Sequence, residues 1–127
     1  MKIGIIKEGK EPIDRRVPLI PEQCSELMEI YPQLSLVVQS SPIRCYGDQD
    51  YQNKGIEIVE DLSDCDLIMG VKEVPLKLLI PNKKYLFFSH TIKQQPYNKN
   101  LLKEILNKKI DLIDYEVLKD LNGDRII

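Results

Sequence analysis

Histidine, tryptophan, cysteine and glycine are all scarce in this sequence of 127 residues, which has one histidine, no tryptophan, three cysteines and six glycines. Three widely spaced cysteines without a C-x-x-C pair, beside a single histidine, support neither a disulfide framework nor a structural zinc site. We therefore predict reduced thiols and no metal site. The apolar runs are too short to span a bilayer and the start shows no secretory pattern, so we expect a cytoplasmic protein without a membrane partner.

An excess of either charge is also lacking, because 18 basic residues stand against 20 acidic ones and the net charge is −2. Without a basic stripe, the sequence gives no reason to expect nucleic acid as a partner. Apolar residues make up 43% of the chain, which is too much for a disordered protein and enough for the core of one domain.

The six glycines are scattered and form neither G-x-G-x-x-G nor G-x-x-x-x-G-K-[ST]. The sequence therefore predicts no phosphate-binding loop and no cofactor-binding residues in this chain. Its last residues, Arg125 to Ile127, begin a new apolar run. We expect the chain to be the front part of a longer protein.

Short apolar segments between polar ones predict a series of strands, at residues 2–6, 34–38, 56–59, 66–71, 85–88 and 110–115. A helix is predicted from Pro21 to Tyr31, and another at residues 98–109. On the second helix four apolar residues are expected in the core, namely Leu101, Leu102, Ile105 and Leu106. Alternating strands and helices predict a three-layer α/β fold, with a mostly parallel sheet and helices on both faces, as in Rossmann and flavodoxin-like proteins.

Polar groups follow four of the predicted strands. They are Lys7, Glu8, Arg15 and Arg16; then Lys72 and Glu73; then Ser89 and His90; and finally Asp114, Tyr115 and Glu116. Parallel strands end at one edge of the sheet, where open α/β sheets bind their ligands. We expect these groups to converge there although they are far apart in the sequence.

A site that holds arginine, lysine, histidine and glutamate side chains suits a substrate with an acid group and an amine. An arginine fork binds a carboxylate in bidentate geometry, while a lysine and a histidine can pass protons to and from an amine. Residue types alone leave other interpretations open. Lys72 and Glu73 can form an exposed ion pair, Arg15 and Arg16 can be solvated, and His90 can cap a neighbouring loop.

Several stretches resemble the superfamily of alanine dehydrogenase, transhydrogenase and saccharopine dehydrogenase. The opening M-K-I-G-I-I-K-E-G-K-E-P-I-D-R-R-V-P-L (residues 1–19) and the segment D-L-I-M-G-V-K-E-V-P (residues 66–75) are similar to superfamily motifs. F-F-S-H-T-I-K-Q-Q (residues 87–95) and L-I-D-Y-E (residues 112–116) resemble the branch of lysine-ketoglutarate reductase and saccharopine dehydrogenase. The resemblance covers essentially the whole chain.

The resemblance implies roles for single residues. Lys72 and His90 match the acid–base pair, and Arg16 matches the arginine that binds a substrate carboxylate, with Arg15 beside it leaving the register open. Glu116 matches a glutamate at the substrate site that tunes the lysine or the histidine. Lys93 and Gln95 belong to the reductase-type motif and are expected to contact substrate.

The resemblance also implies a two-domain parent. Residues 1–127 would be its N-terminal, substrate-side catalytic domain, and a separate domain, missing from this chain, would bind NAD or NADP. The implied reaction interconverts saccharopine with lysine and 2-oxoglutarate. An alanine dehydrogenase-like enzyme and a non-catalytic module that binds amino acids or keto acids remain the alternatives, and a homo-oligomer stays open.

Overall fold

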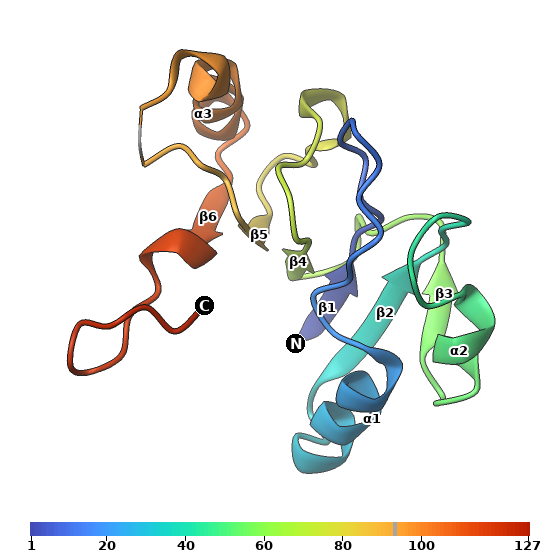
Figure 1. Ribbon diagram of the computed structural model, residues 1–127. Helices are drawn as coiled ribbons and strands as arrows, with labels where there is room; N and C mark the ends of the chain where they lie inside the picture. Colours follow the sequence, from blue (N-terminus) through green and yellow to red (C-terminus); the bar gives the residue numbers. More distant parts are fainter. Residues whose placement is uncertain (93) are drawn as a thin grey trace.

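The computed structural model of the protein describes residues 1–92 and 94–127. In this part of the chain six parallel strands form one sheet in the order β3-β2-β1-β4-β5-β6 (Figure 1). The strands are β1 (Lys2–Ile5), β2 (Ser35–Gln39), β3 (Glu57–Val59), β4 (Leu67–Met69), β5 (Lys84–Phe87) and β6 (Asp111–Asp114). The chain runs outward from β1 to β3 and then returns to place β4 beside β1. The switch point of the sheet therefore lies between β1 and β4.

Helices lie on both faces of the sheet, as predicted. The helix α1 (Pro21–Ile30) and the short helix α2 (Asp48–Gln52) pack on one face, and α3 (Lys99–Asn107) packs on the other, near β5 and β6 (Figure 1). Three turns of 3₁₀ helix complete the elements, at η1 (Leu76–Leu78), η2 (Pro96–Asn98) and η3 (Tyr115–Val117). None of the helices in residues 1–92 and 94–127 is long and apolar enough to cross a membrane.

The alternation of side chains along β1 divides the core into two halves. Ile3 and Ile5 face the layer of α1 and α2, where they pack with Cys24 and Tyr51. Gly4 points to the opposite face, where a Cβ atom would lie 2.8 Å from both Cys65 Sγ and Leu62 Cδ2. The missing side chain of Gly4 therefore lets the segment before β4 lie directly on the sheet.

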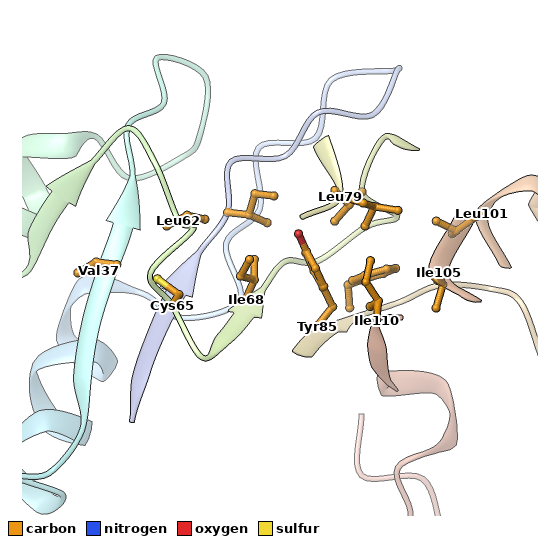
Figure 2. Packing of buried hydrophobic residues seen from close by; sticks show 12 residues of the cluster. Val37, Leu62, Cys65, Ile68, Leu79, Tyr85, Leu101, Ile105 and Ile110 are labelled. Atoms are coloured by element: carbon orange, nitrogen blue, oxygen red, sulfur yellow. The ribbon is translucent and has the colours of Figure 1, made fainter. Parts of the chain in front are cut away.

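The second half of the core lies under α3. Figure 2 shows Leu101 and Ile105 on the side of α3 that faces Ile110, with Tyr85 close by on β5. Tyr85 is fully buried, and its hydroxyl oxygen accepts a hydrogen bond from Ile80 N at 2.9 Å. This polar contact lets a tyrosine occupy the apolar core.

Two of the four apolar residues expected in the core on α3 are exposed. Leu102 is 41% exposed and Leu106 is 69% exposed, whereas Leu101 and Ile105 are buried. The prediction was wrong for Leu102 and Leu106, because α3 contacts the sheet through a single stripe of residues four apart. The neighbouring positions turn away from that stripe.

The thiols occupy two environments. Cys24 and Cys65 are fully buried, and burial raises the pKa of each thiol to about 11. Cys45 is exposed, and all three cysteines are free.

Candidate active site

The switch point of the sheet brings the end of β1 next to the end of β4. The carboxylate of Glu8, which follows β1, accepts hydrogen bonds from Val71 N at 2.7 Å and from Lys72 N at 3.0 Å. Partial burial raises the pKa of the Glu8 carboxyl, although these two backbone donors act in the opposite direction. Glu8 thereby fixes the backbone from which the Lys72 side chain starts.

His90 follows β5 and lies between two carboxylates from the flanking strands. Its Nδ1 is 3.4 Å from Glu116 Oε2, after β6, and its Nε2 is 4.0 Å from Glu73 Oε1, after β4. Glu73 and Glu116 are both buried, while the imidazole is 26% exposed. Each contact becomes an ion pair when the imidazole is protonated.

The backbone of His90 has a φ of 54°, in the left-handed region that costs a residue with a side chain roughly 1–2 kcal/mol. The residues on either side hold this geometry. Ser89 Oγ accepts a hydrogen bond from Thr91 N at 3.1 Å and lies 2.7 Å from Thr91 Oγ1. The ring of Phe88 stacks beside the imidazole with its centroid 6.3 Å away.

The loop after β1 supplies a paired arginine. Arg16 Nε donates to Asp14 Oδ1 at 3.0 Å, and Arg16 Nη2 lies 2.5 Å from Asp14 Oδ2. This pairing lowers the pKa of Asp14 to about 2, and the positive charge of Lys72 acts in the same direction. The carbonyl oxygen of the neighbouring Arg15 accepts a backbone hydrogen bond from Cys45 N at 2.8 Å.

The predicted convergence is thus present in the structure. Lys72, His90 and Glu116 follow β4, β5 and β6 at one edge of the sheet, and Arg16 pairs with Asp14 in the loop after β1. Gln95 is exposed and lines a hollow of about 450 Å³ together with Thr91, Gln94, Pro96, Asn98, Lys99 and Leu102. Lys93 lies outside the described residues. Within the described ranges no three His, Cys, Asp or Glu side chains are placed to hold a metal ion.

Several residues of the cluster were not among the predicted site residues. Glu73 contacts His90, Asp14 pairs with Arg16, and Ser89 and Asp114 support the backbone around His90. Glu73, Ser89 and Asp114 stood in the polar groups at the strand ends, and this position was the available signal. Asp14 gave no such signal, because nothing in its local pattern sets it apart from other loop acids.

The structure is thus an α/β domain with a cluster of polar and charged side chains at the carboxyl edge of its central strands, and its sequence has no G-x-G-x-x-G loop. The chain belongs to the family of the N-terminal domain of alanine dehydrogenase and PNT, whose model matches residues 4–127.

Relatives with similar sequences carry two kinds of name. The chain is 39% identical to an alpha-aminoadipic semialdehyde synthase of Arabidopsis thaliana and 41% identical to the mitochondrial enzyme of that name from Bos taurus, over 98% of its length in each case. It is 28% identical to saccharopine dehydrogenase [NAD(+), L-lysine-forming] of Yarrowia lipolytica over 99% of its length. The chain spans only 12%, 13% and 35% of these three proteins, respectively.

Solved structures agree on the fold. An L-alanine dehydrogenase matches 98% of the chain with a TM-score of 0.79 at 22% identity, and the match covers 35% of that protein. A transhydrogenase from Sinorhizobium meliloti matches 94% of the chain with a TM-score of 0.75 at 15% identity, covering 36% of that protein. The parallel α/β fold is therefore that of the alanine dehydrogenase N-terminal domain.

Proposed function

We propose that this chain is the N-terminal, substrate-side domain of an NAD(P)-dependent oxidoreductase that acts on the CH–NH bond of an amino acid. The proposed reaction interconverts saccharopine with lysine and 2-oxoglutarate. The observation that carries the proposal is the position of His90 between Glu73 and Glu116, on the strand next to the one that presents Lys72. The name of the relative with 28% identity, saccharopine dehydrogenase [NAD(+), L-lysine-forming], supports the choice of substrate.

Lys72 and His90 are the proposed proton carriers. Saccharopine is a secondary amine, and its conversion passes through an imine that water must attack before lysine can leave. Water addition requires a group that accepts a proton, and departure of the amine requires a group that donates one. An imidazole next to two carboxylates and a lysine whose backbone is fixed by Glu8 supply such groups from adjacent strands.

Arg16 is the proposed carboxylate binder. Asp14 already occupies one edge of its guanidinium, through Nε and Nη2. The side chain is 59% exposed, so its remaining N–H donors can receive a substrate carboxylate beside Asp14. The ion pair with Asp14 holds the Arg16 guanidinium in place, which favours Arg16 over Arg15 for this role. Lys93 and Gln95 remain proposed substrate contacts.

The residues of this chain do not form a binding site for the phosphates of NAD or NADP. The connection between β1 and α1 contains one glycine, Gly9. A Cβ atom at Gly9 would lie 3.1 Å from Pro75 Cγ, so this glycine packs against Pro75 and does not belong to a glycine-rich loop around a phosphate. The helix α1 starts at Pro21 after Ile20, instead of after a glycine-rich turn. We therefore assign NAD or NADP to a separate domain. The residues of this chain would bind the amino acid or keto acid and manage its protons.

Activity of the full-length product of the natural reading frame tests the proposal. Saccharopine, lysine with 2-oxoglutarate, and alanine with pyruvate are each assayed with both nicotinamide cofactors. We expect saccharopine-linked turnover that falls roughly 100-fold or more in Lys72→Met and in His90→Gln. Lys103→Met, at an exposed position of α3, is the matched control and should keep full activity.

Other results would contradict the proposal in distinct ways. Turnover of alanine with pyruvate alone would make the protein an alanine dehydrogenase-like enzyme. A folded protein that is inert to every substrate but binds an amino acid or keto acid would favour the non-catalytic module. The three free thiols fit a reducing compartment, and we propose the cytoplasm.

A further inference from the structure

We infer that Ser89 and Asp114 are positioning residues that hold His90 in its left-handed backbone conformation between Glu73 and Glu116. The catalytic meaning of this inference rests on the proposed function of His90. The conformation of the loop after β5 can be measured whether or not His90 has that function.

Ser89 is the centre of the arrangement. Its side chain is fully buried, and its hydroxyl donates to Asp114 Oδ2. The same oxygen accepts from Thr91 N, and with its own proton given to Asp114 it accepts from the hydroxyl of Thr91 as well. Ser89 therefore ties the residue after His90 to the residue before it and bends the backbone at His90 itself.

Asp114 connects this bend to the next strand. It is the last residue of β6 and is only 7% exposed. One carboxylate oxygen accepts from Ser89, and the other accepts from Glu116 N at 2.9 Å. A single buried carboxylate therefore sets the position of both the His90 loop and the Glu116 turn. The contact between His90 Nδ1 and Glu116 Oε2 follows from that shared anchor.

The left-handed φ of His90 shows that the loop imposes this conformation on the residue. A residue with a side chain adopts φ near 54° only when its surroundings hold it there. Asn98 Nδ2 assists by donating to the carbonyl oxygen of His90 at 3.2 Å. With the Ser89 contacts removed, the backbone of His90 is free to return to the regions that residues with a Cβ atom prefer.

The experiment measures the backbone of His90 by NMR in this 127-residue chain, with the variants Ser89→Ala and Asp114→Asn. A left-handed residue brings its own amide and α protons close together and gives a strong intraresidue nuclear Overhauser effect. We expect this signal to fall several-fold in both variants while the amide spectrum of the strands stays in place. His90 is the only histidine, so its imidazole signals need no further assignment and report any displacement of the ring.

Matched controls are available in exposed turns of the same chain. Ser63→Ala removes a hydroxyl that pairs with Asp61, and Asp120→Asn alters a carboxylate that accepts from Asn122 N and Asp124 N. Both should leave the His90 signals unchanged. An unchanged His90 signal in folded Ser89→Ala and Asp114→Asn would overturn the inference. If Ser89→Ala does not fold, Asp114→Asn alone tests the inference, because asparagine keeps the volume of the aspartate side chain and one of its two acceptor oxygens.

A second measurement links the geometry to catalysis in the full-length protein. We expect Ser89→Ala to lower kcat several-fold with little change in KM, because the substrate is still bound but His90 is misplaced. Loss of the NMR signal together with an unchanged kcat would show that the position of His90 does not matter for turnover and would overturn the positioning role. A full-length protein without turnover would contradict the proposed function while the NMR result still decides the geometry.

Discussion

Lys10 Nζ lies 2.6 Å from Glu73 Oε2, so a lysine of the loop after β1 neutralises the carboxylate that follows Lys72. Glu73 is 8% exposed and Lys10 is 41% exposed. The other oxygen, Glu73 Oε1, has no hydrogen bond among the described residues and lies 4.0 Å from His90 Nε2. A buried carboxylate thus depends on Lys10 for its charge balance, and it links that lysine to the imidazole of the candidate site.

Replacing Lys10 by Met should lower the free energy of unfolding by about 1–3 kcal/mol, because it leaves Glu73 buried without its cation. Urea denaturation at neutral pH measures the loss. The double variant Lys10→Met with Glu73→Gln should recover part of it, since no unpaired charge remains. Lys103→Met on the exposed face of α3 is the control. Equal stability of the Lys10 and Lys103 variants would contradict the pairing.

The ion pair of Asp14 with Arg16 should produce a pH-dependent contribution to stability. The pKa of Asp14 falls from an ordinary value of 3.8 to about 2 in the folded chain. A depressed carboxyl pKa stabilises the fold above about pH 4, and this contribution is lost as the pH falls towards about 2. Asp14→Asn should therefore differ most from the wild type above pH 4, by at most about 1 kcal/mol because Arg16 is largely exposed.

Urea denaturation between about pH 2 and pH 6 checks this prediction. Arg16→Gln should show the same loss above about pH 4, and the double variant should add little to either single change. A difference between the wild type and Asp14→Asn that does not shrink as the pH falls would mean that the pair contributes nothing to the pH dependence.

The hydroxyl of Tyr85 should contribute more to the free energy of unfolding than the hydroxyl of an exposed tyrosine. Tyr85→Phe removes the acceptor of the hydrogen bond from Ile80 N and leaves a partly buried amide unsatisfied, at a cost of about 1–2 kcal/mol. Tyr97, which is 70% exposed, gives the matched change, and Tyr97→Phe should have no measurable effect. Thermal and urea denaturation of the two variants compare them directly. A cost below the measurement error in Tyr85→Phe would show that water or another group replaces the hydroxyl.

Adding a methyl group at Gly4 should destabilise the fold by roughly 1–3 kcal/mol, because the new Cβ atom would overlap two buried side chains, Cys65 and Leu62, at 2.8 Å. Gly47→Ala is the control, since its nearest atom, Asp50 Oδ2, lies at an ordinary distance of 3.6 Å. Denaturant midpoints of the two alanine variants give the comparison. If Gly4→Ala were as stable as Gly47→Ala, the packing of residues 62–65 on β1 would be looser than the structure shows.

Local patterns were sufficient for most elements of the fold. The helix α1 begins at Pro21, which suits a first helical position, and its end at Ile30 comes shortly before Pro32. The only local indication of the helix α2 is Gly55, a residue type common just after the end of a helix, because five residues are too short for a helical period to show. It forms around Tyr51, which is fully buried and donates a hydrogen bond to the carbonyl oxygen of Leu19. That contact lies far away in the sequence and leaves no local signal.

The candidate site was predictable at the level of strand ends, but its internal contacts were not. The pattern of an apolar strand followed by polar residues pointed to Lys72, His90 and Glu116, and these lie at one edge of the sheet. The role of Ser89 could not be predicted, since a serine after a strand is common and only its burial distinguishes it. Whether Glu73 is buried or exposed was equally undecided by the alternation of side chains.

The polar residues at the end of each strand can be identified from the sequence, because hydrophobic periodicity is a local property of the chain. Which of these residues meet depends on the order of the strands in the folded sheet. β5 lies between β4 and β6, so the histidine after β5 stands between Glu73 and Glu116. β1 lies beside β4, so Glu8 binds the backbone of Lys72. The order of the strands depends on how the two halves of the core pack against helices that are far apart in the sequence. Local sequence patterns therefore do not predict this order.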